Sequence, residues 1–136
     1  NRDFFAKIET VRLAAGAAMG MGDCSRSVTP KFGLLYPVEG AGHIGARYFM
    51  PWETHPTMAV TGSQALASCA LTPGTIADKM MTIPKERPAK ITLHHLMGEM
   101  DVLVDYDMAD GQFVHKSAGL VRTARKLAQG DLFVPA

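Results

Sequence analysis

The stretch His55-Pro-Thr-Met-Ala-Val-Thr-Gly-Ser-Gln-Ala-Leu-Ala-Ser-Cys-Ala-Leu71 decides the fold of this chain. After Gln64 it contains only Ala, Leu, Ser and Cys, without a charge or a polar stripe. A helix that is apolar on all sides is buried rather than amphipathic. Thr72-Pro73-Gly74 then ends the helix. We therefore expect a central helix over 62–72, with strands on either side in the sequence wrapped around it.

The start of this helix allows two interpretations. Thr61 and Gln64 have the spacing of a capping box, in which both side chains satisfy backbone N–H groups at the helix start. Alternatively, the unpaired N–H groups of the first turn and the helix dipole bind an anion. Gly62 would then let the ligand approach the backbone, and Ser63 would add a hydroxyl donor. From the motif alone, both interpretations stay open.

Composition places the chain among ordinary soluble single domains. It has 136 residues, 47% of them hydrophobic and 20% charged, and a net charge of +1 without runs of one sign. The absence of a clustered basic face argues against nucleic-acid binding, and no apolar run spans a bilayer or resembles a signal peptide. Cys24 and Cys69 form neither a disulfide framework nor a metal-binding pattern. We expect a cytoplasmic protein without a membrane partner or a metal site.

The first segment predicts an amphipathic helix over 3–19. Asn1 or Asp3 can cap it, and Gly20 and Gly22 end it. Its apolar face is formed by Phe4, Phe5, Ile8, Val11, Ala15 and Met19, and Arg12 falls outside that face.

The remaining segments predict strands. Two form a hairpin around a Gly-rich turn, at 32–36 and 43–50, and two more form a second hairpin, at 91–97 and 100–106. A helix can continue or restart over 77–81, a long strand bent at Gly119 covers 113–125, and a last strand covers 132–134. The expected fold is α+β, a curled, barrel-like antiparallel sheet wrapped around one central helix.

Several motifs in this order resemble the PrpF family, a branch of the diaminopimelate epimerase-like proteins. They are Glu9–Asp23 (ETVRLAAGAAMGMGD), Val28–Lys31 (VTPK), Ala46–Pro51 (ARYFMP), His55–Gly62 (HxxxAVTG), Pro73–Thr75 (PGT) and Arg122–Lys126 (RTARK). That family includes 4-oxalomesaconate tautomerase, methylitaconate delta-isomerase and aconitate isomerase. Where the family often has a His-Pro-Ser-Gly-like stretch, this chain has His95-Leu-Met-Gly98, which leaves the exact substrate open.

The resemblance implies two similar halves, each a curled sheet around a central helix, with the active site between them. Residues 1–136 would be the C-terminal half, with a linking helix over 1–22 and the sheet and central helix over 23–136. The chain starts at Asn1 without an initiator Met, so we expect it to be partial. In the family the proton-shuttling Lys and Cys lie in the first half, and the Thr-Cys-Gly-Asn-like motif of that Cys does not occur here. We therefore expect no catalytic residue in this chain and a missing N-terminal half as its partner.

The resemblance assigns carboxylate binding to the start of the central helix, at Val60, Thr61, Gly62 and Ser63. We add Lys31, Ser27 and His55 as further candidate ligands for the substrate. Lys31 can instead flank a strand in solvent, and His55 can simply order its loop. The implied reaction is a cofactor-independent 1,3-proton shift in an unsaturated di- or tricarboxylic acid such as 4-oxalomesaconate, aconitate or methylitaconate. Ala59 stands about where the amino-acid epimerases place a second catalytic cysteine, which argues against racemisation.

Other interpretations remain open. A noncatalytic carboxylate-binding or dimerising module would have the same fold, and an isolated half would expose an apolar cleft face that favours a homodimer. A hot-dog-type thioesterase also wraps a sheet around one helix, but it needs an acidic residue that 64–71 lacks. Cys69 is expected in the core, and His94 and His95 point to opposite faces of a strand and cannot share a metal. Arg122 and Arg125 fit either a cleft or a solvated strand edge.

Overall fold

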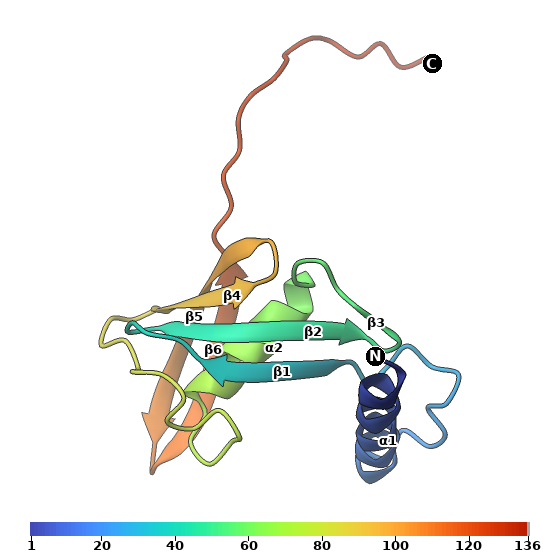
Figure 1. Ribbon diagram of the computed structural model, residues 1–136. Helices are drawn as coiled ribbons and strands as arrows, with labels where there is room; N and C mark the ends of the chain where they lie inside the picture. The colour runs from blue at the N-terminus through green and yellow to red at the C-terminus, as the bar shows by residue number, and fades with distance from the viewer. Residues whose placement is uncertain (136) are drawn as a thin grey trace.

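A computed structural model describes residues 1–135, and position 136, which the predicted domain includes, lies outside the described residues. The elements follow one another as α1 (Arg2–Ala18), β1 (Phe32–Pro37), β2 (His43–Met50), β3 (Glu53–Thr54), α2 (Val60–Leu71), β4 (Ala89–His95), β5 (Gly98–Ala109) and β6 (Gln112–Leu120). Figure 1 shows α2 enclosed by the curled sheet and α1 standing at the ends of β1 and β2. The predicted α+β fold, a curled sheet around one central helix, is confirmed.

The strands form one six-stranded sheet in the order β1-β2-β4-β5-β6, with β3 paired to β2. Both predicted hairpins are present, as antiparallel β1–β2 and β4–β5 pairs. The prediction of a wholly antiparallel sheet is wrong at one place, because β2 and β4 pair in parallel. The chain between these strands passes through α2, and such a crossover returns the second strand in the direction of the first.

The core lies between α2 and the concave face of the sheet. Strand alternation turns one set of side chains towards α2, and the buried members include Ile44, Ala46, Tyr48, Ile91, Leu93, Val102 and Val104. On α2, Ala67, Ala70 and Leu71 are buried against them. The helix is not enclosed on all sides, however, since Thr61 and Ala65 are exposed. The sheet therefore leaves the N-terminal part of α2 open along one side.

Helix α1 packs differently from its predicted apolar face. Phe4 and Phe5 pack against Phe49 of β2 in a tilted and an edge-to-face arrangement, with ring centroids 5.8 and 6.0 Å from that of Phe49. Val11 is 54% exposed, whereas Arg12 is buried. The predicted orientation of Arg12 is thus wrong, because its guanidinium finds an ion pair and several backbone carbonyls on the protein side of the helix.

Two predicted elements are absent from the described chain, and a third is shorter than predicted. Strand β6 ends at Leu120 instead of continuing to 125, no strand is found at 132–134, and 77–81 forms turns instead of helix. A strand needs a neighbour for its backbone hydrogen bonds, and residues 121–135 extend away from the sheet (Figure 1). Among residues 1–135, no helix is long and apolar enough to span a membrane.

Candidate functional site

The first turn of α2 has backbone N–H groups without a hydrogen-bond partner in the described residues. Its N-cap residue is Ala59, in an extended conformation and without a side chain that can accept a hydrogen bond. Within residues 1–135, the amides of Val60, Thr61 and Gly62 have no protein acceptor, whereas the Ser63 amide donates to Ala59 O at 2.8 Å. These free N–H groups and the helix dipole together favour an anion at this position.

The predicted capping box is not formed. Gln64 Nε2 donates to the carbonyl of Ala118 in β6 at 2.9 Å, so this side chain turns towards the sheet instead of back to the helix start. Thr61 is exposed and is not the N-cap residue. The sequence left two interpretations of this helix start open, and the capping box of Thr61 and Gln64 is therefore the wrong one.

A cavity of about 340 Å³ lies over this helix start. Its lining comes from β1, β2, α2 and the residue just before β1, namely Lys31, Gly33, Tyr48, Thr61, Gly62, Ala65 and Leu66. Lys31, Thr61 and Gly62 were among the predicted binding residues, and the fold brings them to one hollow. Their role in binding stays a prediction.

Buried Arg12 fixes the loop that delivers Lys31. Its guanidinium forms two 2.7 Å hydrogen bonds to the Glu9 carboxylate, which hold the pKa of that carboxyl below its ordinary value. It also donates to backbone carbonyls of the loop before β1, those of Cys24, Ser27, Thr29 and Pro30. The loop is thereby tied to α1 up to the residue that precedes Lys31.

The other predicted residues take local roles. The Ser63 hydroxyl is buried and donates to Val60 O at 2.7 Å, and Ser27 Oγ accepts from the Thr29 amide at 3.1 Å. His55 Nδ1 accepts from the Thr57 amide at 3.1 Å, the loop-ordering contact that was the alternative to ligand binding. None of these three side chains lines the cavity.

Four histidines lie on the two faces of β2 and β4 or in the loop after β3, namely His43, His55, His94 and His95. The pKa of His95 is lowered, first by burial and then by the nearby charges of Arg47 and His55. On the opposite face of the sheet, His43 Nδ1 and His94 Nε2 lie 2.8 Å apart, and His94 Nδ1 lies 3.3 Å from Glu99 Oε1. No group of three or more potential metal ligands occurs within the described residues.

Sequence reasoning did not identify Tyr48 as a residue of the site. It was assigned to a strand, and only the alternation of 43–50 could have placed it on the same face as Ile44 and Ala46. In the structure its ring lies against Gly62, so closely that a Cβ at position 62 would be 2.5 Å from two ring carbons. Burial raises the pKa of its hydroxyl.

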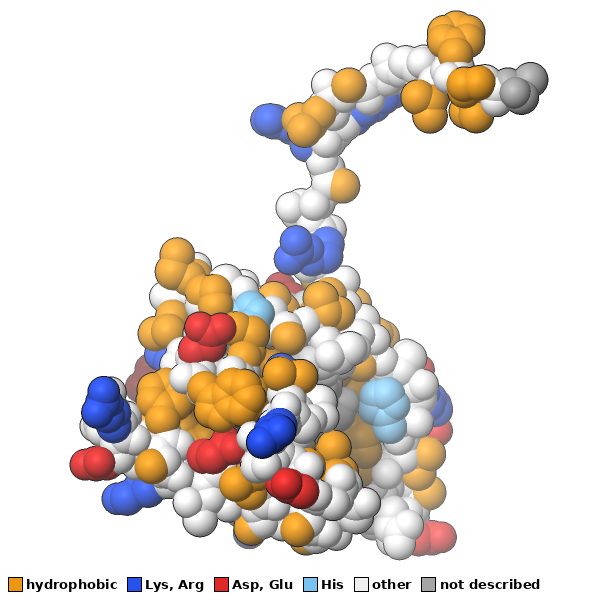
Figure 2. Space-filling model, turned by 90° about the vertical axis from the view of Figure 1, so that its right-hand side faces the viewer, with side chains coloured by type: hydrophobic (Ala, Val, Ile, Leu, Met, Phe, Trp, Pro, Cys, Tyr) orange, Lys and Arg blue, Asp and Glu red, His pale blue; other side chains and the backbone are white. Residues whose placement is uncertain are grey.

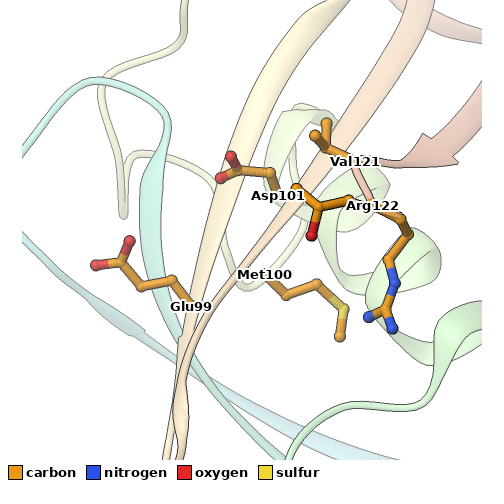
Figure 3. A pocket seen from close by; sticks show the side chains of 6 residues that line it. Glu99, Met100, Asp101, Val121 and Arg122 are labelled. Carbon is orange, nitrogen blue, oxygen red and sulfur yellow. The ribbon is translucent and has the colours of Figure 1, made fainter. Parts of the chain in front are cut away.

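A larger hollow, of about 510 Å³, lies where the chain leaves β6 and is lined by Glu99, Met100, Asp101, Val121, Arg122 and Thr123. Figure 3 shows the carboxylates of Glu99 and Asp101 directed away from the Arg122 guanidinium. Asp101 is held by Lys90 at 2.8 Å and by Thr92 at 2.7 Å. Two carboxylates in the lining disfavour a carboxylate ligand, so the smaller cavity at α2 is the better candidate site.

The family model for PrpF protein matches residues 1–135. The chain belongs to the PrpF family. This agrees with the resemblance carried by the short motifs.

Three curated relatives are similar to this chain over nearly its whole length. The isomerase YbhH of Escherichia coli strain K12 is 35% identical over 135 residues, which is 99% of this chain and 37% of YbhH. The (4E)-oxalomesaconate Delta-isomerase of Novosphingobium sp. strain KA1 is 37% identical over 134 residues, 98% of this chain and 37% of that protein. The 4-oxalomesaconate tautomerase of Pseudomonas putida KT2440 is 31% identical over 124 residues, 91% of this chain and 33% of that protein. The PrpF chain described here thus spans about a third of the length of these relatives.

A crystal structure of methylitaconate-delta-isomerase has the same fold, with a TM-score of 0.67 at 18% identity. The match covers 90% of this PrpF chain and 37% of that structure. It supports the curled sheet around α2 as a unit of a larger architecture.

Proposed function

We propose that this chain is the carboxylate-binding part of a cofactor-independent isomerase. The reaction is a 1,3-proton shift in an unsaturated di- or tricarboxylic acid: a proton leaves one carbon, the double bond moves, and a proton is added at another carbon. The observation that carries the proposal is the uncapped start of α2, where Thr61 and Gly62 have free amides and line a cavity together with Lys31. The names of the oxalomesaconate and methylitaconate isomerases support the choice of substrate class.

In this proposal the chain binds and orients the substrate. Backbone N–H groups fix one carboxylate, and the Lys31 ammonium supplies a full positive charge near it. Fixed donors also stabilise the negative charge of an enolate-like intermediate without reorganising during the reaction. The acid and base are assigned to the remainder of the full-length protein, because the Thr-Cys-Gly-Asn-like motif of the family's proton-shuttling Cys does not occur in this chain. Ala59, beside the proposed binding amides, has no proton to exchange, which argues against racemisation.

We further propose that the remainder of the protein packs against the exposed apolar surface of this chain. Seen from the α1 side, Figure 2 shows hydrophobic side chains gathered among charged ones on that face, and the C-terminal residues rising above the rest of the molecule. Large exposed hydrophobic residues occur on α1, after β2 and in the C-terminal residues, for example Val11, Trp52, Leu132 and Phe133. Surface of this kind is typical of an interface, and in a homodimer the same surface would be the contact.

The test is an isomerisation assay on the full-length protein with 4-oxalomesaconate, aconitate and methylitaconate, followed by NMR in D2O. We expect conversion of one of these acids, with deuterium incorporated at the carbon that receives the proton. Lys31→Met should raise KM about 10-fold or more, because it removes a charged partner of the substrate. Lys85→Met, which removes an exposed loop lysine away from the cavity, is the matched control. Binding of the acids without conversion would favour the noncatalytic binding module instead.

A further inference from the structure

Tyr48 of β2 lies against the first turn of α2. It lies near the end of β2 with its side chain on the helix-facing side of the sheet, and it is 8% exposed. A Cβ added to Gly62 would be 2.8 Å from the Tyr48 hydroxyl oxygen and 2.5 Å from the neighbouring ring carbons. The hydroxyl edge of the ring is therefore directed at the first turn of α2, where the free amides are.

The Tyr48 hydroxyl has no hydrogen-bond partner among residues 1–135, although nine-tenths of the residue is buried. Buried tyrosine hydroxyls usually have a partner. No fully enclosed side-chain oxygen or nitrogen in the described chain lacks one, so the Tyr48 hydroxyl oxygen keeps some access to its surroundings, and Tyr48 is one of the residues that line the cavity at α2. The hydroxyl is a donor beside this cavity, and no acceptor among residues 1–135 uses it.

We propose that the Tyr48 hydroxyl donates a hydrogen bond to a carboxylate oxygen of the ligand bound at the start of α2. In this arrangement one carboxylate accepts hydrogen bonds from the Thr61 and Gly62 amides of α2, from the Tyr48 hydroxyl of β2 and from the Lys31 ammonium of the loop before β1. This inference rests on the proposed function and names a binding residue that the sequence motifs did not indicate.

The chemistry of the phenol suits a donor better than a proton shuttle. Burial raises the pKa of Tyr48, so the hydroxyl keeps its proton at neutral pH and is a weaker acid than a free tyrosine. At neutral pH, where the substrate carboxylates are ionised, it can therefore direct a hydrogen bond at one of them. Gly62 has a matching role, because any side chain there would displace the ring that carries the donor.

The test is the affinity of the full-length protein for tricarballylate, a saturated tricarboxylate that cannot undergo the proton shift, measured by calorimetry. Tyr48→Phe removes the hydroxyl and keeps the ring, and it should weaken binding roughly 10- to 100-fold, the value of one hydrogen bond to a charged group. In the assay, KM should rise by the same factor with kcat little changed. Tyr106→Phe is the matched control, since Tyr106 is also buried but stacks on Phe113 and does not line the cavity.

The outcomes separate the two proposals. If wild type binds tricarballylate and Lys31→Met weakens binding but Tyr48→Phe does not, the role of Tyr48 is overturned and the proposed function stands. If wild type neither binds tricarballylate nor isomerises an unsaturated acid, both proposals are overturned. A loss of affinity in Tyr48→Phe without a change in melting temperature, and none in Tyr106→Phe, supports the inference.

Discussion

Helices α1 and α2 begin in opposite ways. At the start of α1, Asn1 Oδ1 accepts a hydrogen bond from the Phe4 amide at 3.3 Å, so the protein itself caps this helix. At the start of α2, Ala59 offers no side-chain acceptor, and Thr61 and Gly62 line a cavity together with Tyr48. A capped start contributes stability, whereas an uncapped start leaves donors for a ligand. The difference is the reason why ligand binding is proposed at α2 and not at α1.

The helices also differ in where they place charge. Helix α1 buries Arg12 with Glu9 and uses them to hold a loop, while α2 has no charged residue. The charges of α1 thus stabilise the position of a loop. Helix α2 itself can attract an anion only through its backbone dipoles. Each of the following changes alters one side of this contrast, and all are to be made in the full-length protein.

The largest effect is expected from Arg12→Leu. The change leaves Glu9 without its partner and leaves the carbonyls of the loop before β1 without a donor. Breaking a buried ion pair in this way costs roughly 3–5 kcal/mol, to be measured as the free energy of unfolding in urea. Arg26→Leu, at an exposed arginine of the same loop, should change it little. Equal effects of the two changes would refute a special role for Arg12.

The next effect is expected from Gly62→Ala. The added methyl group meets the Tyr48 ring at 2.5 Å, and such overpacking costs about 1–3 kcal/mol. Displacing the ring should also weaken tricarballylate binding. Gly119→Ala is the control, because nothing lies within 4 Å of a Cβ at that position. If Gly62→Ala binds as well as wild type, the close approach of ring and helix is not needed for the site.

Ala59→Ser gives α2 the cap that α1 already has. A serine at the N-cap should stabilise the helix by about 1 kcal/mol and, because its hydroxyl occupies a first-turn amide, should weaken tricarballylate binding. Asn1→Ala is the reverse change at α1, with an expected loss of about 0.5 kcal/mol and unchanged binding. Stability is read from urea unfolding and affinity from calorimetry. Unaltered affinity in Ala59→Ser would argue that those amides do not contact the ligand.

The smallest effect is a pH dependence confined to α1. The Arg12 hydrogen bonds lower the pKa of Glu9 from its ordinary value of 4.5 in the folded state. The contribution of this carboxylate to stability is therefore fully present above about pH 4.5 and is lost as the pH falls through the lowered pKa. Glu9→Gln should flatten the acid side of the stability curve, measured by urea unfolding between pH 3 and 7. A curve as steep as that of wild type would contradict the assignment.

Local patterns were enough to place the helices, the two hairpins and the apolar central stretch. They were also enough to locate the candidate site at Thr61 and Gly62 and to name Lys31 as its neighbour. The capping box failed because the same Gln64 side chain had a competing acceptor, the Ala118 carbonyl, 54 residues further along the chain. The strand over 113–125 was extended too far because alternation describes a strand's side chains and not whether a neighbouring strand is present.

By itself the sequence determined the class of fold and the family and indicated the place of the proposed anion site, since these depend on residue spacing, helix-ending residues and a helix start. Only the tertiary structure decided that α2 starts without a cap, that Arg12 is buried, that β2 and β4 run in parallel, and that Tyr48 directs its hydroxyl at Gly62. The physical reason is range. Helix ends and periodicity arise from neighbours within a few residues, whereas the hydrogen-bond partner of a side chain such as Gln64 and the contacts of a ring depend on which distant segments the fold brings together.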